Sequence, residues 1–423
     1  MLHMQRRSFL VSAATAATAS GWAGANDKVR VAIAGMGGRG NALMTESLAI
    51  EHLEVAAMVD PDGRRTEAAA AKLLDKTGRR ARLYSDARRA LDDKEIDALL
   101  VSTCNHWHAL LGIWACQAGK DAYVEKPVSH NLFEGRKLVE AARKYKRIVQ
   151  GGTQRRTWGR FRQAIEVVHS GAIGDVYQAT WVFPGGRDSI GFKDPASTPP
   201  AWLNWDSWLG PAPMQKYHEN LVHYNWHWFW DFGNGELGNN GIHMVDVARW
   251  GMGKGLPARV YSTGGRFGYK DQAETPNTQT VTWTYADGSA IIGQLRGLYT
   301  NEPMRWDFFG SKGHLHLFAD GKYEVTMGRE KKPAPGPVVE DGGDEAHLRN
   351  FAEAVKARDQ SKLNADIEET YLSTGLCHLG NISYRLGREV KFDAARERFI
   401  GDAAADAMLT RAYRKPYLVP DKV

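Results

Sequence analysis

The run VAIAGMGGRG, residues 31–40, constrains the fold more than any other stretch, because an apolar segment stops abruptly in glycines. Glycine is costly to order, so a turn that uses several must approach something that a side chain would obstruct. The residues before the turn have the β-branched content of a buried strand, and those after it begin a helix. Gly35, Gly37 and Gly40 fit GxGxxG, which permits a tight turn, backbone approach to a pyrophosphate and close helix packing. The pattern predicts a dinucleotide-binding turn.

A second apolar run, LEVAAMVDPD, supports this interpretation about 20 residues further on. It ends at Asp60, where a dinucleotide fold places the acid that accepts a hydrogen bond from a ribose 2′-hydroxyl. The same carboxylate repels a 2′-phosphate, which predicts NAD as the cofactor over NADP. Arg64 and Arg65 are close enough to weaken this preference, so NADP stays as the less favoured alternative.

Strand-like and helix-like segments alternate up to about residue 150. Such alternation predicts a doubly wound parallel sheet, whose ligands bind at the carboxyl ends of the strands. Thr103, Glu125 and Lys126 fall at strand ends of this kind. We therefore expect an α/β fold with a Rossmann domain over residues 27–150.

The character of the sequence changes at residue 151. Several strands follow, some of them joined by the hairpin signals Asp287-Gly288 and Asp320-Gly321. Helices flank these strands, so residues 151–423 are predicted to form a second α/β domain on an open, largely antiparallel sheet. The late helices of this domain are expected to pack back on the first.

Composition excludes several classes of protein. With 423 residues, 43% of them hydrophobic and 25% charged, the chain can form two substantial cores. The net charge of +6 is not gathered in a nucleic-acid-binding motif, so no nucleic-acid partner is predicted. The three cysteines lack CxxC spacing, and no disulfide framework is expected.

The first 26 residues have the order of a bacterial export signal. Arg6 and Arg7 precede a mildly apolar, alanine-rich run, and Ala23, Gly24 and Ala25 form an AxA-type cleavage site. The segment resembles a twin-arginine signal, which predicts contact with the export machinery and a periplasmic or otherwise exported protein. A disordered basic tail is the alternative. The apolar run is too short and too rich in alanine for stable membrane insertion.

Five stretches together resemble the glucose-fructose oxidoreductase and inositol dehydrogenase family (Gfo/Idh/MocA): the glycine turn, the strand ending at Asp60, STCNHWH, EKP and GELGNNGIH. The resemblance implies an N-terminal Rossmann domain that holds NAD(P) and a C-terminal open sheet that carries a sugar or cyclitol site. It also implies subunits paired through that sheet, as a homodimer or homotetramer. The implied chemistry is hydride transfer at a secondary alcohol carbon, with the EKP lysine as a catalytic group.

Lys126 suits that role on physical grounds. Oxidising an alcohol by hydride transfer requires a base at the hydroxyl, and an oxidised nicotinamide nearby lowers a lysine pKa. An ordinary surface lysine paired with Glu125 is the alternative. His243 is the second candidate, but the family's dehydrogenases carry an aspartate four residues before this histidine, where this chain has Asn239. Asn239 cannot stabilise an imidazolium by charge, so we expect a less basic His243. A helix cap at Asn239 and a structural histidine are the alternative interpretation.

Two tryptophan-rich stretches, residues 199–211 and 217–236, form the predicted substrate wall, because aromatic faces stack on sugar C–H surfaces. Tyr224, His227 and Asp231 are its candidate hydroxyl contacts. His223 and His227 could share a metal if helical, but no third ligand is evident, and His314 and His316 are interpreted as structural. No metal site is predicted.

The complete assignment follows from these patterns and from the resemblance. The catalytic candidates are Lys126, His243, Asn239, His227 and Tyr224. The cofactor candidates are Gly35, Met36, Gly37, Gly38, Arg39, Gly40, Asp60, Arg64, Thr103, Asn105, His108, Glu125, Lys126 and Gln154. The substrate candidates are Lys126, Arg155, Tyr224, His227, Asp231, Asn239 and His243.

Three functions are compatible with the sequence. The first is an exported NAD-dependent oxidoreductase of a sugar or cyclitol that keeps its cofactor bound, since no NAD pool exists outside the cytoplasm. The second is a glycosidase that transiently oxidises a ring hydroxyl, eliminates the aglycone, adds water and returns the hydride. It needs a further base for the proton α to the ketone, for which His243, His227 and Tyr224 are candidates. The third is a sugar-binding protein without turnover.

Overall fold

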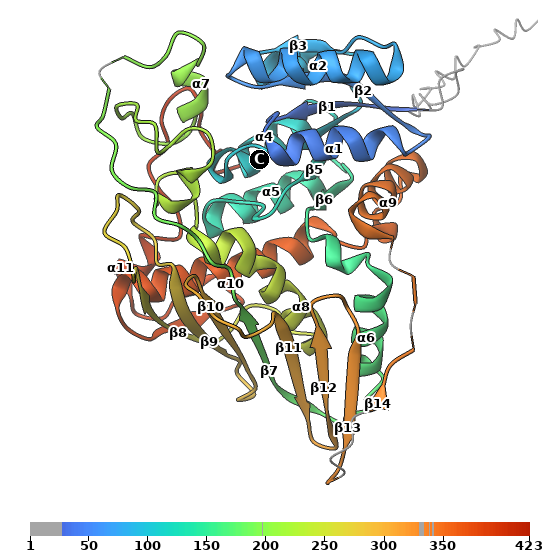
Figure 1. Ribbon diagram of the computed structural model, residues 1–423, viewed down its shortest axis with the longest axis vertical. Coiled ribbons are helices and arrows are strands. Elements are labelled where there is room, and N and C mark those ends of the chain that lie inside the picture. The colour runs from blue at the N-terminus through green and yellow to red at the C-terminus, as the bar shows by residue number, and fades with distance from the viewer. Residues whose placement is uncertain (1–27, 197, 330–333, 338, 341) are drawn as a thin grey trace, which may run out of the picture.

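A computed structural model describes residues 28–196, 198–329, 334–337, 339–340 and 342–423. The predicted export signal lies outside these residues. Two sheets stand one above the other, with helices between and around them (Figure 1). The predicted α/β class and both predicted kinds of sheet are confirmed.

The N-terminal sheet is parallel throughout, with strand order β3-β2-β1-β4-β5-β6. Its strands are β1 (Val29–Ala34), β2 (Leu53–Val59), β3 (Arg82–Tyr84), β4 (Ala98–Val101), β5 (Asp121–Val124) and β6 (Val149–Gly151). The helices that alternate with them are α1 (Gly38–Leu48), α2 (Gly63–Thr77), α3 (Ala87–Asp92), α4 (Asn105–Gln117) and α5 (Leu132–Lys144). The strand order reverses between β1 and β4, and this switch point is where an open α/β sheet binds its ligand.

The C-terminal sheet has ten strands, in the order β14-β13-β12-β11-β7-β10-β9-β8-β15-β16. They are β7 (Val176–Phe183), β8 (Arg259–Gly265), β9 (Thr278–Thr284), β10 (Ala290–Arg296), β11 (Arg305–Gly310), β12 (Gly313–Phe318), β13 (Tyr323–Met327), β14 (Ala334–Pro335), β15 (Val390–Asp393) and β16 (Arg398–Phe399). Neighbouring strands are antiparallel except β7 and β10, which run parallel. Gly288 and Gly321 turn the two predicted hairpins at φ values of +85° and +81°.

The other helices are α6 (Gly159–His169), α7 (Trp205–Leu209), α8 (Ile242–Met252), α9 (Gly343–Ala357), α10 (Ile367–Leu386) and α11 (Ala403–Asp406). Short 3-10 turns occupy Gln154–Arg156, Asn225–Trp228 and Gln360–Lys362, and Leu237–Gly241 forms a π-helical turn before α8.

Alternating burial explains how the C-terminal sheet packs. In β9 and β10 every second residue is buried, including Val281, Trp283, Ile291 and Leu295. These side chains belong to one hydrophobic core with residues of α8 and α10, which lie between the sheet and the N-terminal domain (Figure 1). The intervening residues of both strands are half-buried on the opposite face.

Helix α9 belongs to the second half of the sequence but packs on the first domain. Leu348, Phe351 and Val355 are fully or almost fully buried in one cluster with Val31 and Ile33 of β1. Figure 1 shows α9 beside α1. The N-terminal core is therefore completed by residues more than 300 positions away along the chain.

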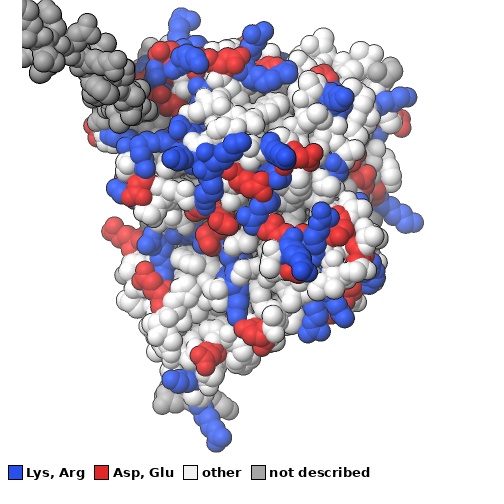
Figure 2. Space-filling view, turned by 180° about the vertical axis from the view of Figure 1, so that it is seen from behind, with Lys and Arg blue, Asp and Glu red and all other residues white. Residues whose placement is uncertain are grey.

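The distribution of surface charge and the lengths of the helices bear on whether the protein contacts other charged molecules or a membrane. Figure 2 shows acidic and basic side chains intermingled over the face it presents, in the manner of an ordinary solvated surface. Among the residues whose placement is described, every helix is too short or too polar to cross a bilayer.

Candidate active site

A cleft of about 450 Å³ opens at the carboxyl ends of β1 and β4. Its walls come from both halves of the chain: the glycine turn, the strand ends at Thr103 and Glu125, and segments of the C-terminal domain around Tyr224 and Asn239. The volume falls in the range of sites for small molecules and cofactors. Its position at the switch point of the sheet is the one predicted from the sequence.

The glycine turn has the shape that a pyrophosphate requires. Gly35 has a φ of +90°, and a Cβ there would lie 2.5 Å from the Ser102 carbonyl oxygen. A Cβ on Gly40 would lie 1.8 Å from the Gly35 carbonyl oxygen, so this glycine lets α1 pack against the turn. Gly38, the first residue of α1, borders the cleft, and a Cβ there meets nothing within 4 Å. The helix N-terminus thus presents unobstructed backbone amides to the cleft, an arrangement that binds phosphate groups.

Asp60 lies at the cleft wall and fixes the turn as well. Its carboxylate accepts hydrogen bonds from the backbone N–H groups of Met36 at 2.7 Å and Asp62 at 2.9 Å. Burial raises the pKa of Asp60, and the two backbone hydrogen bonds oppose that rise. Each oxygen keeps a lone pair for a ribose hydroxyl. Arg65 borders the cleft beside it, whereas the Arg64 guanidinium is paired with Asp62 at 2.8 Å outside the cleft.

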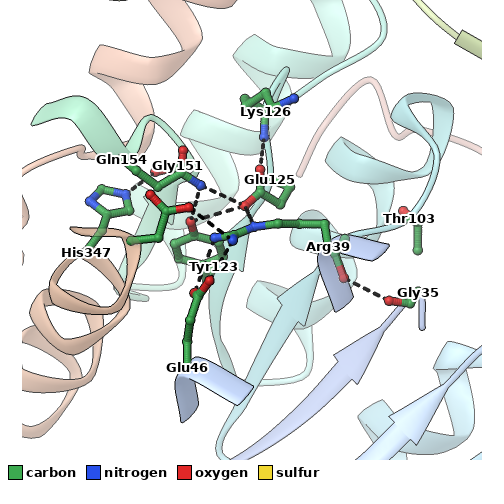
Figure 3. A network of polar contacts seen from close by, with 12 residues as sticks. Gly35, Arg39, Glu46, Thr103, Tyr123, Glu125, Lys126, Gly151, Gln154 and His347 are labelled. Carbon is green, nitrogen blue, oxygen red and sulfur yellow. Dashed lines mark hydrogen bonds and ion pairs between the residues drawn. The ribbon is translucent and has the colours of Figure 1, made fainter. Parts of the chain in front are cut away.

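Arg39 is the centre of a partly buried ion-pair network (Figure 3). Its guanidinium contacts Glu125 at 2.6 Å, Glu46 at 2.7 Å and Asp344 at 3.3 Å. These partners come from the end of β5, from α1 and from α9. One side chain of the glycine turn therefore ties together the cofactor turn, the strand that carries Lys126 and a helix of the C-terminal domain.

Glu125 is almost fully buried and lies at the meeting point of several donors. The Gln154 amide donates to it at 2.9 Å, and the Tyr123 hydroxyl donates at 3.3 Å. Burial alone would raise the pKa of Glu125, but the charges of Arg39 and Lys126 outweigh it and the pKa lies below its ordinary value. Glu125 is therefore a stable carboxylate beside the cleft.

Lys126 comes directly after Glu125 in the sequence, and it borders the cleft. Its Nζ donates to the backbone carbonyl oxygen of Asn239 at 2.8 Å. Burial lowers the pKa of Lys126, and the charges of Arg39 and Arg187 lower it further, while Glu125 and Glu236 act in the opposite direction. A lysine with a lowered pKa loses its proton more readily than an ordinary lysine and can act as a base.

His243 and Asn239 border the same cleft, opposite the glycine turn. Burial lowers the pKa of His243 well below its ordinary value, and Arg155 and Lys126 add to this effect. His243 is therefore a neutral imidazole, in the direction expected from the asparagine at position 239. The side-chain amide of Asn239 donates a hydrogen bond to the Glu236 carboxylate, at 3.4 Å.

The aromatic segment contributes part of the predicted substrate wall. Tyr224 and Trp226 border the cleft, and Tyr224 is 55% exposed. His227 lies behind them, 1% exposed, with its Nδ1 2.8 Å from the Tyr224 carbonyl oxygen. Burial lowers the pKa of His227 to about 4. Asp231 lies away from the cleft on an exposed turn, where it accepts a hydrogen bond from Gln215.

The turn after β4 lies as expected for two of its polar residues. Asn105 and His108 border the cleft, and the His108 imidazole lies between the carbonyl oxygens of Pro127 and Thr103. His106 instead points into the aromatic cluster, with its nitrogens near the carbonyl oxygens of Phe232 and Trp208, because its ring packs among these side chains.

Most of the predicted residues meet at the cleft, and some do not. Those that border it are Gly35, Gly37, Gly38, Arg39, Asp60, Thr103, Asn105, His108, Glu125, Lys126, Gln154, Tyr224, Asn239 and His243. Those outside its lining are Met36, Gly40, Arg64, Arg155, His227 and Asp231. Arg155 lies among the rings of Trp158, Phe161 and Trp306, and burial lowers its pKa to about 10.

Several cleft residues were not predicted: Asp86, Trp107, Asn240, Asp344 and Tyr417. Asp344 and Tyr417 come from late segments that fold back on the N-terminal domain, and nothing in their local sequence signals this. Asn240 lies next to Asn239 in GELGNNGIH, so the motif itself marked it.

The two histidines interpreted as structural lie on the open face of the C-terminal sheet. His314 Nε2 and His316 Nδ1 lie 3.0 Å and 2.6 Å from the same Asp307 oxygen. The imidazole N–H groups donate to this oxygen, and Arg305 contacts the other oxygen of the carboxylate at 3.4 Å. Hydrogen bonds between β11 and β12 account for the arrangement.

Comparison with known proteins bears on both halves of the chain. A family model described as "Oxidoreductase family, NAD-binding Rossmann fold" (GFO_IDH_MocA) matches residues 29–153. A second, described as "Oxidoreductase family, C-terminal alpha/beta domain", matches residues 146–419. The prediction of an NAD-binding Rossmann domain is thereby confirmed.

Curated relatives are similar over part of their length. A myo-inositol 2-dehydrogenase of Thermotoga maritima is 26% identical over 247 residues, which are 58% of this chain and 62% of that protein. A levoglucosan dehydrogenase of Pseudarthrobacter phenanthrenivorans is 24% identical over 40% of this chain and 36% of its own. The aligned part of this chain thus spans less than two thirds of either relative.

Solved structures share the fold across most of the chain. One is an oxidoreductase from Agrobacterium radiobacter in complex with NAD+, L-tartaric acid and magnesium, with a TM-score of 0.65 and 17% identity over 86% of this chain and 98% of that chain. Another is an aldose-aldose oxidoreductase from Caulobacter crescentus, with a TM-score of 0.64 and 20% identity over 86% of this chain and 100% of that chain. The two family models together cover nearly the whole described chain, and the protein belongs to the Gfo/Idh/MocA oxidoreductase family.

Proposed function

We propose that this protein is an NAD-dependent oxidoreductase that acts on a secondary alcohol of a sugar or cyclitol. The observation that carries the proposal is the Lys126 amine, which has a lowered pKa and borders the cleft between the glycine turn and the wall formed by Tyr224 and His243. A base at that place can reach a hydroxyl group bound beside the nicotinamide end of a dinucleotide.

The glycine turn and the surrounding residues fit NAD, as the open space at Gly38 and the carboxylate of Asp60 show. NAD, when bound, accepts a hydride from the alcohol carbon or returns it. Gly37 and Gly38 would hold the pyrophosphate, and Asp60 would hold the adenosine ribose. Arg39, through Glu125, holds the β5 end that carries Lys126.

Lys126 in its neutral form would accept the proton of the substrate hydroxyl during oxidation and give it back during reduction. Its hydrogen bond to the Asn239 carbonyl fixes the direction of the amine. His243, a neutral imidazole on the same cleft, would hydrogen-bond the substrate. Because the pKa of Lys126 is lowered, oxidation is expected to rise with pH through a value below the ordinary lysine value and then to level off.

A polyhydroxylated substrate suits the cleft wall. The exposed ring of Tyr224 can stack on a C–H face of a sugar, and the cleft also offers amide and imidazole groups to hydroxyls. The names of the relatives, a myo-inositol 2-dehydrogenase and a levoglucosan dehydrogenase, support the same class of substrate.

The proposal includes export and a tightly held cofactor. Its support is the order of Arg6, Arg7 and the AxA site in residues 1–26. A cofactor that dissociated outside the cytoplasm would be lost after one turnover, so a closed redox cycle is expected. A homodimer or homotetramer formed through the open face of the C-terminal sheet completes the proposal, and light scattering of the purified protein tests it.

One observation favours the redox glycosidase as the second candidate. Lys126 and His243 both have lowered pKa values and both border the cleft. A transient-oxidation cycle needs two bases, one for the hydroxyl proton and one for the proton α to the ketone. His243 would be the second.

The test uses purified protein with any co-purified nicotinamide extracted and identified. Free sugars and aryl glycosides are then added while the absorbance of the reduced cofactor is followed. Stoichiometric reduction by a free sugar, reversed by a second carbonyl compound, supports the oxidoreductase. Aglycone release without net reduction supports the glycosidase, and neither change in the presence of bound cofactor supports a sugar-binding protein.

Lys126→Met is the matched variant, because it keeps the length of the side chain and removes the amine. We expect at least a ~100-fold loss of turnover, within the usual contribution of a general base. NAD affinity, measured by quenching of tryptophan fluorescence, should stay within a few-fold. Wild-type turnover in this variant would contradict the assignment of Lys126.

A further inference from the structure

Glu236 is a buried carboxylate beside the active site that the sequence pattern did not single out. Its side chain is 1% exposed, and it belongs to the GELGNNGIH stretch just before the π-helical turn. Three groups converge on it: the Asn239 amide at 3.4 Å, the Asn240 amide in close contact, and the Arg187 guanidinium at 3.3 Å. A carboxylate so deep is stable only with partners of this kind.

These contacts link Glu236 to the base of the proposed reaction. Asn239 donates to Glu236 through its side chain and accepts from Lys126 Nζ, at 2.8 Å, through its backbone carbonyl. One residue therefore bridges the buried carboxylate and the amine. The neighbouring Asn240 holds the same carboxylate from the next position of the turn.

The charges around Lys126 are unevenly balanced. Arg39 from the glycine turn and Arg187 from the loop after β7 disfavour a charged amine, as does burial. Glu125 favours it but is already engaged with Arg39 at 2.6 Å. Glu236 is the second carboxylate that favours the charged amine. The imidazoles of His243 and His227 also face Lys126, and both are neutral because burial lowers their pKa values.

We propose that Glu236 is a positioning residue: it holds the side chains of Asn239 and Asn240 in place and supplies negative charge to the surroundings of Lys126. The inference rests on the proposed role of Lys126 as proton acceptor. The structure places this carboxylate three residues before Asn239, whose side chain it contacts, while the Asn239 backbone carbonyl holds the Lys126 amine.

The first test measures Lys126 directly, without any substrate. Protein carrying ¹³C-labelled lysine is titrated by NMR, and the Lys126 signal is assigned from its absence in Lys126→Met. Glu236→Gln removes the charge and keeps the hydrogen-bonding shape, so the pKa of Lys126 should fall by about one, the lower end of the effect of a nearby opposite charge. Glu236→Asp keeps the charge and should restore most of the wild-type value. Glu274→Gln, which neutralises an exposed carboxylate, is the control and should change nothing.

The second test keeps the proposal open to refutation if Glu236→Gln fails to fold. Arg187→Met removes the cation that partly neutralises Glu236 and that itself disfavours a charged Lys126, so the pKa of Lys126 should rise. An unchanged Lys126 titration in folded Glu236→Gln, or in Arg187→Met, overturns the inference.

The two proposals fail in different ways. If the protein turns over sugars, the pH at which oxidation levels off should shift with the Lys126 titration in Glu236→Gln, downward by about one. A shifted titration with no turnover of any sugar leaves Glu236 as the charge partner of Lys126 and refutes the proposed function. If the Lys126 pKa shifts in Glu236→Gln but the pH profile of turnover does not, the role of Glu236 in the reaction is refuted.

Discussion

Removing the guanidinium of Arg39 should destabilise the protein and do so in a pH-dependent way. Arg39→Met leaves Glu125, 4% exposed, without the cation that contacts it at 2.6 Å. Breaking one partner of a buried pair costs about 3–5 kcal/mol, and because Gln154 and Tyr123 still donate to Glu125, we expect the lower value, about 3 kcal/mol. At the ~2 °C per kcal/mol of a large chain, the Tm should fall by roughly 6 °C at pH 7.

The pH dependence follows from the direction of the pKa of Glu125. In the wild type this pKa is lowered, so the stability that Glu125 contributes is present above the ordinary glutamate value and is lost as the pH falls through the lower, folded value. In Arg39→Met, burial dominates and the pKa rises above the ordinary value. The carboxyl group then takes up a proton as the pH falls toward 5, and the difference in Tm from wild type should shrink.

The assay is thermal unfolding at several pH values, followed by circular dichroism. Arg79→Met is the matched control, because the Arg79–Glu54 pair is largely exposed and such pairs contribute about 0–1 kcal/mol. A Tm of Arg39→Met within about 1 °C of the control, or a difference that does not shrink in acid, would refute the reasoning.

Three further predictions concern the cleft. Gly35→Ala should lower the Tm, because a Cβ at φ +90° would lie 2.5 Å from the Ser102 carbonyl oxygen. Gly38→Ala should keep the Tm, because a Cβ there meets nothing within 4 Å, but the methyl group would occupy space at the cofactor turn. The Kd for NAD, measured by fluorescence titration, should therefore rise by at least ~10-fold. Asp60→Asn should reduce the preference for NAD over NADP by at least ~10-fold in the ratio of binding constants, and an unchanged ratio would contradict its assigned role. Tyr224→Ala should raise KM for a sugar by roughly 10-fold with kcat little changed, as expected for lost ring stacking; steady-state kinetics on an active substrate would show it.

The position of the cleft was predictable because it depends on local patterns. The glycine turn, Asp60 and Lys126 each follow an apolar run, and the ends of parallel strands meet at one edge of a sheet. Spacing along the chain is then enough to bring them together, whatever the remainder of the sequence does.

Residues in loops are harder to place from the sequence. Residue type made Asp231 and His227 candidates, but whether a side chain in a loop reaches a cleft depends on tertiary packing, and His227 packs behind Tyr224. Glu236 could not be assigned from the sequence, because its contacts with Asn239, Asn240 and Arg187 depend on how the turn before α8 folds. The spacing of Glu236 to the two asparagines, three and four residues, is the one sequence signal that pointed to it.

The packing of α9 also decides how the protein can be recombined. A chimera made by a single crossover near residue 151 would join the cofactor-binding half of this chain to a C-terminal half from another protein. The buried side chains of Val31 and Ile33 in β1 would then lose their packing partners in α9, which are Leu348, Phe351 and Val355. The exchangeable unit is therefore discontinuous: the first 150 residues together with the helix at 343–357. We expect that a change of substrate in related proteins is reached by replacing the loops around Tyr224. Exchange of the whole C-terminal half would leave the N-terminal core incomplete.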